Sequence, residues 1–133
     1  MAFVEWNESV DVHVDIINKQ HKHFIDLINK LYECLGSGKT DKISSIINDL
    51  TSYTLSHFKT EEDLFDKFHY EGTDDHRTAH HIIKTKVREI LERQDDPKAI
   101  GFDLLYLLER WLFVHIKGMD KKYTDCFHKN GLR

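Results

Sequence analysis

The chain has 133 residues, of which 40% are hydrophobic and 32% charged. These values are typical of a soluble globular protein, and we expect residues 1–133 to form one domain. The net charge of −4 and the lack of a basic cluster argue against nucleic acid or an anionic membrane surface as a partner. Because no apolar run is long enough for a membrane span and MAFVEWNESV does not look like a signal peptide, we expect a cytoplasmic protein without membrane insertion.

The first half of the chain predicts an irregular arm followed by two helices. Apolar residues recur every three or four positions from about Asp15 to about Leu35, which indicates a helix with one buried face. The stretch GSGKTD then interrupts the pattern, and Thr40 or Asp41 can cap a second helix. The same periodicity continues to about Phe68.

The second half predicts two more helices. The third follows the break HYEGTD and reaches about Arg93. The fourth follows QDDP, where Asp96 can act as the cap and Pro97 occupies the first helical position, at which its missing N–H costs nothing. Four helices with short connections predict an all-α, antiparallel up-down four-helix bundle with an irregular N-terminal arm.

Seven polar residues fall on the inward faces of these helices, where a bundle normally places apolar side chains. They are His21, His57, Glu61, His76, His80, His115 and Asp120. In an antiparallel bundle all seven come within about 20 Å of the same end, at about 1.5 Å per residue. A single inward histidine is commonly a hydrogen-bonded core residue, but seven such groups on four helices indicate a shared metal site.

The types of ligand narrow the choice of metal. Five imidazoles and two carboxylates exceed the three or four protein ligands of one tetrahedral zinc ion. They suit two six-coordinate ions such as iron, with the carboxylates bridging, and such a site weakens at acid pH because its imidazoles must be neutral. A ferritin-like oxidase is rejected, because that bundle requires more carboxylates and Glu-x-x-His pairs.

The spacing between His115 and Asp120 does not fit a straight helix. Five residues at about 100° each turn the two side chains away from a common direction. Both can face one centre if the helix loosens or forms a π-bulge near Gly118, or if Asp120 reaches across.

Four segments resemble the helix motifs of the hemerythrins, specifically of the single-domain bacterial and archaeal group. They are NKQHKHF, HFKTEEDLF, HRTAH and WLFVHIKGMDKKY, and the likeness covers nearly the whole chain as a single hemerythrin-like domain. The resemblance implies two iron ions joined by a bridging oxo or hydroxo group. The ligands it implies are His76, His80 and His115 for one iron, His21 and His57 for the other, and Glu61 and Asp120 as bridges.

The resemblance also implies a function: reversible dioxygen binding for transport, storage or delivery, by a protein that is not an enzyme. The residues implied to line the oxygen pocket are Phe24, Phe58, Trp111 and Ile116. Their bulk beside the ligands would exclude water. We expect a monomer or weak oligomer whose ligand is dioxygen, with an oxygen-consuming enzyme as a further partner. A peroxidase, a nitric-oxide- or oxygen-reducing enzyme, or an oxygen or redox sensor on the same centre stays open.

Some residues near the motifs depart from the family pattern or are not expected to bind metal. Asn18 stands where the family commonly has aspartate, and His13 stands where glycine is common. Glu62 is interpreted as a solvated neighbour of Glu61. The remaining histidines are expected at the surface, and they are His13, His23, His69, His81 and His128. Among them, His81 directly follows the implied ligand His80 in the sequence.

Overall fold

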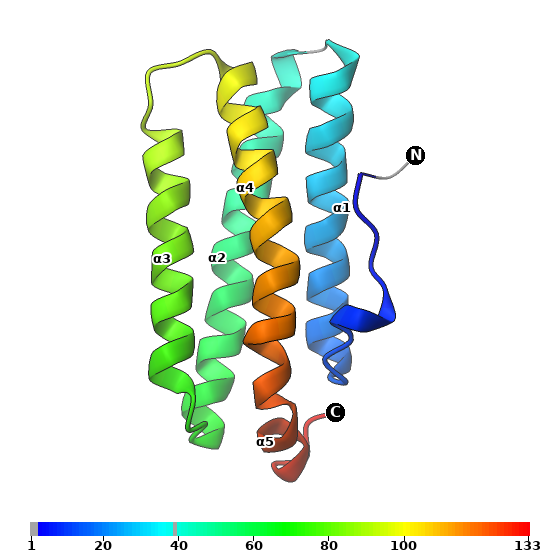
Figure 1. The fold of residues 1–133 in the computed structure, drawn as a ribbon, viewed down its shortest axis with the longest axis vertical. Coiled ribbons are helices and arrows are strands. Elements are labelled where there is room, and N and C mark those ends of the chain that lie inside the picture. Colours follow the sequence, from blue (N-terminus) through cyan, green and yellow to red (C-terminus); the bar gives the residue numbers. More distant parts are fainter. Residues whose placement is uncertain (1–2, 39) are drawn as a thin grey trace.

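The computed structural model describes residues 3–38 and 40–133, and its architecture is the expected four-helix bundle. The long helices are α1 (Asp15–Ser37), α2 (Ile43–Phe68), α3 (Thr73–Leu91) and α4 (Pro97–Gly118). They run alternately up and down, so that α1 and α3 begin at the end where α2 and α4 finish (Figure 1). The all-α fold class is therefore confirmed. None of the helices in the described part of the chain is long and apolar enough to cross a membrane.

Four short elements accompany the bundle. Three are 3-10 turns, η1 (Glu8–Val10), η2 (Thr40–Lys42) and η3 (Asp120–Tyr123), and the fourth is the terminal helix α5 (Thr124–Lys129). The turn η2 corrects one prediction, because α2 begins only at Ile43 with Lys42 as its N-cap. The predicted start of α4 is confirmed, since the Asp96 side chain accepts a hydrogen bond from the backbone N–H of Lys98.

The core follows the apolar periodicity of the helices. Each long helix turns one face inward, and α1 provides the clearest case, with side chains three or four residues apart buried along its whole length. The fully buried apolar residues of α1 include Ile17, Phe24, Ile28, Leu31 and Leu35. This face of α1 stays apolar after its first turns, and the buried histidines and carboxylates of the core lie toward one end of the bundle, whereas Thr54 in the middle of α2 bonds the Leu50 carbonyl of its own helix.

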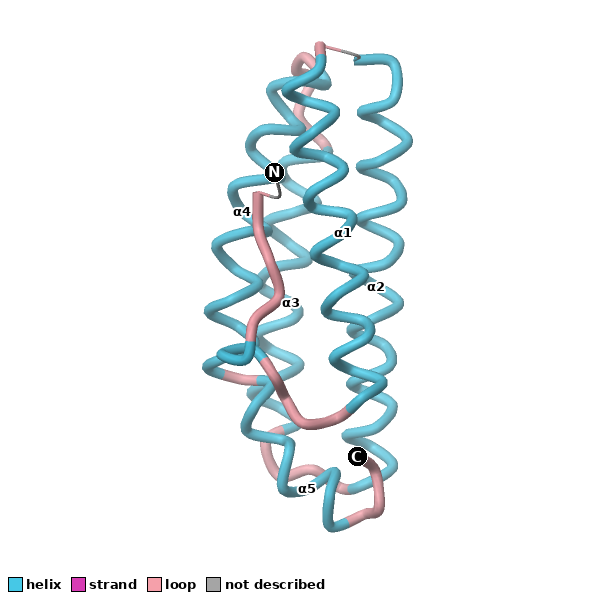
Figure 2. The backbone as a smooth tube through the Cα atoms, turned by 90° about the vertical axis from the view of Figure 1, so that its right-hand side faces the viewer, coloured by secondary structure: helices cyan, strands magenta, loops and turns pink. Residues whose placement is uncertain are grey.

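The N-terminal arm is packed onto the bundle and is not a loose tail. Val10, Val12 and Val14 are fully buried. The Asn29 side chain fixes the outer part of the arm, accepting from the backbone N–H of Val4 at 3.0 Å and donating to its carbonyl at 2.9 Å. In Figure 2 the arm runs along the bundle beside α1 and α4 before it turns into α1. The arm thus closes the side of the bundle formed by these helices.

The residues before α1 explain why asparagine suits position 18. The Asn18 amide nitrogen donates to Asp11 Oδ1 at 2.7 Å, and its oxygen accepts from the backbone N–H of Val12 at 3.1 Å. The backbone N–H of His13 also donates to Asp11, and these hydrogen bonds lower the pKa of that carboxyl. An aspartate at position 18 could not donate to Asp11 and would repel it, so Asn18 and Asp11 form a matched pair.

Replacing His13 with glycine is expected to stabilise the protein by about 0.5–1 kcal/mol. His13 adopts a positive φ of 56°, a left-handed conformation that costs a residue with a side chain roughly 1–2 kcal/mol, partly offset by the greater freedom of glycine in the unfolded chain. Urea unfolding measures the difference. His23→Gly is the control, because His23 lies exposed inside α1, where glycine costs about 1 kcal/mol. Equal losses in both variants would contradict the assigned backbone strain.

Candidate metal centre

The seven inward polar residues predicted from the sequence converge in the buried core. Their side chains are at most 5% exposed, and all four long helices or their immediate ends contribute to the group. They lie toward the end of the bundle at which α1 and α3 begin. The structure therefore brings together every residue of the predicted set: His21, His57, Glu61, His76, His80, His115 and Asp120.

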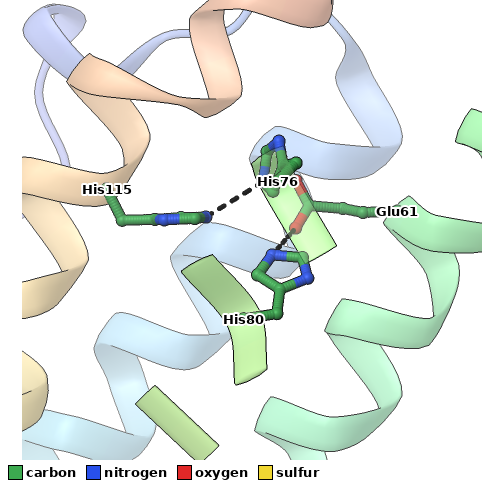
Figure 3. A group of neighbouring side chains, drawn as sticks. All are labelled: Glu61, His76, His80 and His115. Carbon is green, nitrogen blue, oxygen red and sulfur yellow. Dashed lines mark hydrogen bonds and ion pairs between the residues drawn. The ribbon is translucent and has the colours of Figure 1, made fainter. Parts of the chain in front are cut away.

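The seven residues form two overlapping groups. Within each group the side-chain nitrogen and oxygen atoms all lie within 4.8 Å of one another, close enough to hold a metal ion. The first group, drawn in Figure 3, consists of Glu61, His76, His80 and His115. The second group consists of His21, His57, Glu61 and Asp120. One end of the bundle thus offers two neighbouring metal positions, which we call the three-histidine position and the two-histidine position.

Glu61 lies between the two positions. Its Oε1 atom is 3.2 Å from Nε2 of His57, which belongs to the two-histidine position. The same atom is 3.3 Å from Nε2 of His80, which belongs to the three-histidine position. The side chain of Glu61 is fully buried, so its carboxylate has no access to bulk water.

Asp120 also contacts imidazoles from both positions. Its Oδ2 atom is 3.0 Å from Nε2 of His21. Its Oδ1 atom is 3.0 Å from Nε2 of His76 and 3.0 Å from Nε2 of His115. Both carboxylates therefore contact imidazoles of both positions.

Of the alternatives left open for Asp120, the structure agrees with a loosening of the helix near Gly118. The helix α4 ends at Gly118, and Met119 leaves helical geometry with φ −121° and ψ −53°. Asp120 then opens the 3-10 turn η3. The change of direction at the helix end points the carboxylate back toward His115, which a continuous helix could not do. A π-bulge within α4 is therefore not the explanation.

The polar atoms of the cluster have unused bonding capacity. Among the described residues, both carboxylate oxygens of Glu61 and of Asp120 make no hydrogen bond, and neither does Nε2 of His21 or of His80, so these atoms have only the ion-pair contacts within the cluster. Burying so many polar atoms without hydrogen bonds is costly, and native cores avoid it. The donor set fits a pair of metal ions, which would engage these atoms at once.

Without metal, the charges of the cluster compensate one another. Burial and the charge of Asp120 act to raise the pKa of Glu61, but the neighbouring His57 and His80 outweigh them and lower it well below its usual range. Burial likewise opposes the charged form of His57, yet Glu61 raises its pKa. Protonation of His57 is therefore favoured by Glu61, and a proton held there must leave when a metal ion binds that ring.

Two residues outside the predicted set form hydrogen bonds to imidazoles of the cluster, on the ring nitrogen that faces away from it. His57 Nδ1 donates to Gln20 Oε1 at 2.6 Å, while Nε2 of the same ring faces the cluster. His80 Nδ1 donates to Glu62 Oε2 at 2.9 Å. The interpretation of Glu62 as a merely solvated neighbour of Glu61 was wrong. Each residue directly adjoins a ligand in the sequence, which was the available signal, but periodicity does not show which way its side chain turns.

An aromatic layer covers one side of the centre. Phe58 stacks on His80 with ring centroids 3.8 Å apart, and Trp111 stacks on His115 at 4.5 Å. Phe58 and Trp111 meet edge to face at 5.4 Å, and Phe24 lies 6.5 Å from Trp111. Three of the four predicted pocket residues thus form one layer against the imidazoles.

Ile116, the fourth predicted pocket residue, is also fully buried beside His115 in the chain. Trp111 is only half-buried and lines an outer groove between α3 and α4, together with Val114 and Met119. The same groove reaches His115. Trp111 therefore covers one face of the His115 ring at the border between this groove and the cluster.

Tyr123 is a buried neighbour of the cluster that the sequence analysis did not identify. It is fully buried, and its ring stacks on His76 with centroids 5.8 Å apart. Burial, together with the charges of Glu61 and Asp120, raises the pKa of Tyr123 well above its usual value. The hydroxyl is therefore kept neutral next to the two carboxylates.

The raised pKa of Tyr123 predicts a loss of stability in alkali. The folded protein retains the hydroxyl proton at a pH where the unfolded chain has lost it. The contribution of Tyr123 to the free energy of unfolding is therefore complete below about pH 10 and declines by about 1.4 kcal/mol per pH unit above it. Urea unfolding of metal-free protein between about pH 9 and 11.5 measures this slope. Tyr123→Phe should make the slope shallower, leaving the smaller part due to Tyr53 and Tyr70, whose pKa values burial also raises, whereas Tyr106→Phe, at a residue 53% exposed, should leave it unchanged. Equal slopes in all three proteins would refute the assignment.

The remaining histidines lie outside the cluster, as expected. Four are exposed: His13, His23, His69 and His81. The fifth, His128, is half-buried, and its Nε2 donates to the backbone carbonyl of His13 at 2.7 Å. It thereby joins α5 to the N-terminal arm.

Fold and site together define a helical-bundle protein with a buried histidine and carboxylate cluster able to hold metal. Comparison with known proteins gives the same class. Residues 12–126 match the Hemerythrin HHE cation binding domain. Because this match covers most of the chain, the protein belongs to the hemerythrin family.

Individual relatives are similar over nearly their full length. The chain is 33% identical to a bacteriohemerythrin from Pseudomonas aeruginosa over 126 residues, which are 95% of this chain and 82% of the relative. It is 32% identical to a hemerythrin-like protein from Naegleria gruberi, covering 89% of this chain and 88% of the relative. A wild-type hemerythrin crystal structure superimposes with a TM-score of 0.79 at 26% identity, covering 94% and 98% of the two chains.

Proposed function

We propose that this protein binds dioxygen reversibly at a non-heme diiron centre, as a carrier, store or delivery protein. The observation that carries the proposal is the placement of two buried carboxylates between imidazoles of both groups, at 3.0–3.3 Å. Membership of the hemerythrin family supports iron as the metal. Two ferrous ions bound here would supply the electrons needed for dioxygen binding.

The residues divide into three roles. One iron would be held at the three-histidine position and the other at the two-histidine position, with both carboxylates shared. The proposed ligands are His76, His80 and His115 for the first, His21 and His57 for the second, and Glu61 and Asp120 for both. The two-histidine position has one protein donor fewer, which leaves room for an external ligand.

The surrounding side chains keep this centre dry. Phe24, Phe58 and Ile116 are at most 2% exposed, and with Trp111 they place carbon atoms where water would otherwise approach. Dioxygen is apolar and enters such surroundings readily, whereas an ion or a cluster of water molecules does not. We infer that these residues line the oxygen pocket and slow irreversible oxidation of the iron.

The experiment that tests this function is a visible spectrum of anaerobically reduced, iron-loaded protein. We expect a charge-transfer band that forms when dioxygen is added and disappears when the solution is purged with argon. Direct conversion to a stable oxidised spectrum with release of peroxide would refute reversible binding and indicate a diiron redox enzyme. Iron analysis of the same sample should give two ions per chain.

A further inference from the structure

We propose that Glu62 and Gln20 make the two metal positions electronically different, by providing a charged acceptor behind one ligand imidazole and a neutral acceptor behind another. The proposal rests on the proposed diiron function and concerns positioning residues, since neither side chain belongs to the two metal-holding groups. Glu62 acts through His80 at the three-histidine position. Gln20 acts through His57 at the two-histidine position.

Glu62 is held in place on both sides. Its Oε2 atom accepts from His80 Nδ1 at 2.9 Å, while Oε1 lies 3.3 Å from Nε of Arg77. Arg77 is in turn held by Asp66, with Nη2 2.7 Å from Oδ2. The Glu62 side chain is only 21% exposed. This chain of contacts joins α2 to α3 and directs one carboxylate oxygen at the ring.

Gln20 occupies the equivalent place behind His57 without a charge. Its Oε1 atom accepts from His57 Nδ1 at 2.6 Å. Its amide nitrogen donates to the Thr60 hydroxyl at 3.4 Å, which holds the oxygen toward the ring. The contact joins α1 to α2, just as the Glu62 contact joins α2 to α3. The two positions thus have similar supports that differ in charge.

Other imidazoles of the cluster do not share this support. In the described residues, Nδ1 of His21 and Nδ1 of His76 have no hydrogen-bond partner. Within the described part of the chain, His57 and His80 are the cluster histidines with a side-chain acceptor on the ring nitrogen that faces away from the cluster. Beyond the different number of imidazoles, the difference in charge behind the rings therefore lies in these two hydrogen bonds.

The charge of the acceptor determines how strongly the ring donates to a metal. A carboxylate draws the Nδ1 proton toward itself and leaves more electron density on Nε2, whereas an amide oxygen does so less. A stronger donor favours ferric over ferrous iron, so the three-histidine position should be the harder one to reduce. The neutral support at His57 leaves the two-histidine position easier to return to the ferrous state.

The test exchanges the two acceptors and measures reduction potentials of iron-loaded protein by spectroelectrochemistry. Glu62→Gln should weaken the preference for ferric over ferrous iron about tenfold, raising the potential of one couple by about 59 mV. Gln20→Glu should lower the potential of the other couple by a similar amount. The double exchange should combine both shifts. A loss of packing alone would not give shifts of opposite sign.

Two surface variants serve as charge-matched controls. Asp63→Asn removes a carboxylate one residue from Glu62, at an exposed side chain that pairs with Lys59. Ser56→Glu adds one beside His57 at an exposed position. Neither should shift either potential measurably. Shifts of the same sign in Glu62→Gln and Gln20→Glu, or unchanged potentials in both, would overturn the proposal. The proposed function would still stand in that case if the wild-type protein binds two irons and oxygenates reversibly.

Discussion

Glu61→Gln is expected to reduce bound iron from two ions per chain to fewer than one. Glu61 Oε1 lies 3.2 Å from His57 and 3.3 Å from His80, so one substitution removes an anionic donor from both metal positions. Losing an outer partner of a ligand typically weakens metal binding about 10- to 100-fold, and losing a shared ligand should weaken it by more. Iron analysis after anaerobic loading and desalting measures the effect.

Asp63→Asn provides the matched control for this substitution. It makes the same change of charge on the same helix, but its side chain is 64% exposed and pairs with Lys59. This variant should retain two irons. Circular dichroism of both metal-free proteins checks that the bundle has folded. A folded Glu61→Gln protein that keeps both irons would disprove the bridging role.

Phe58→Ala is expected to destabilise the metal-free protein by about 3–5 kcal/mol, the usual cost of removing a buried aromatic ring. Phe58 is 1% exposed, and its ring stacks on His80 and meets Trp111 edge to face. The cavity would also admit water to the imidazoles. We therefore expect faster oxidation of reduced, iron-loaded protein in air. Urea unfolding and the decay of the oxygenated spectrum measure the two effects.

Phe102→Ala separates these effects from the loss of any phenylalanine. Phe102 is half-buried near the start of α4, where it stacks against Tyr106 far from the ligands. Its removal should cost less stability and leave the oxidation rate at the wild-type level. If the two alanine variants oxidised equally fast, Phe58 would have no special part in protecting the iron.

The convergence of the seven polar residues could be predicted because they break a simple rule. Imidazoles and carboxylates on apolar faces contradict the helical pattern, and a bundle of four alternating helices brings such exceptions to one level. His57 with Glu61 and His76 with His80 are four residues apart, which by itself places each pair on one helix face. Burial of all seven side chains agrees with that reasoning.

Residues whose placement depends on tertiary direction were harder to predict. Glu62 and Gln20 adjoin ligands, but only the packing of neighbouring helices determines that their side chains turn behind a ring. Asp120 was identified, yet its route through a helix end and a 3-10 turn depends on the backbone at Met119. The burial of Tyr123 in turn depends on α5, which the periodicity did not reveal. The spacing of residues along the sequence does not indicate these side-chain directions, because they depend on tertiary packing.

The hydrogen bond from His128 to the carbonyl of His13 has a mechanical consequence. Thr124 donates to the carbonyl of Val12 at 2.7 Å, so two bonds fasten the segment after Asp120 to the segment before His21. The chain is thereby closed into a loop, in which the first and last ligands in the sequence are anchored to each other. A force that pulls the two chain ends apart would therefore act on these two hydrogen bonds before it acted on the cluster.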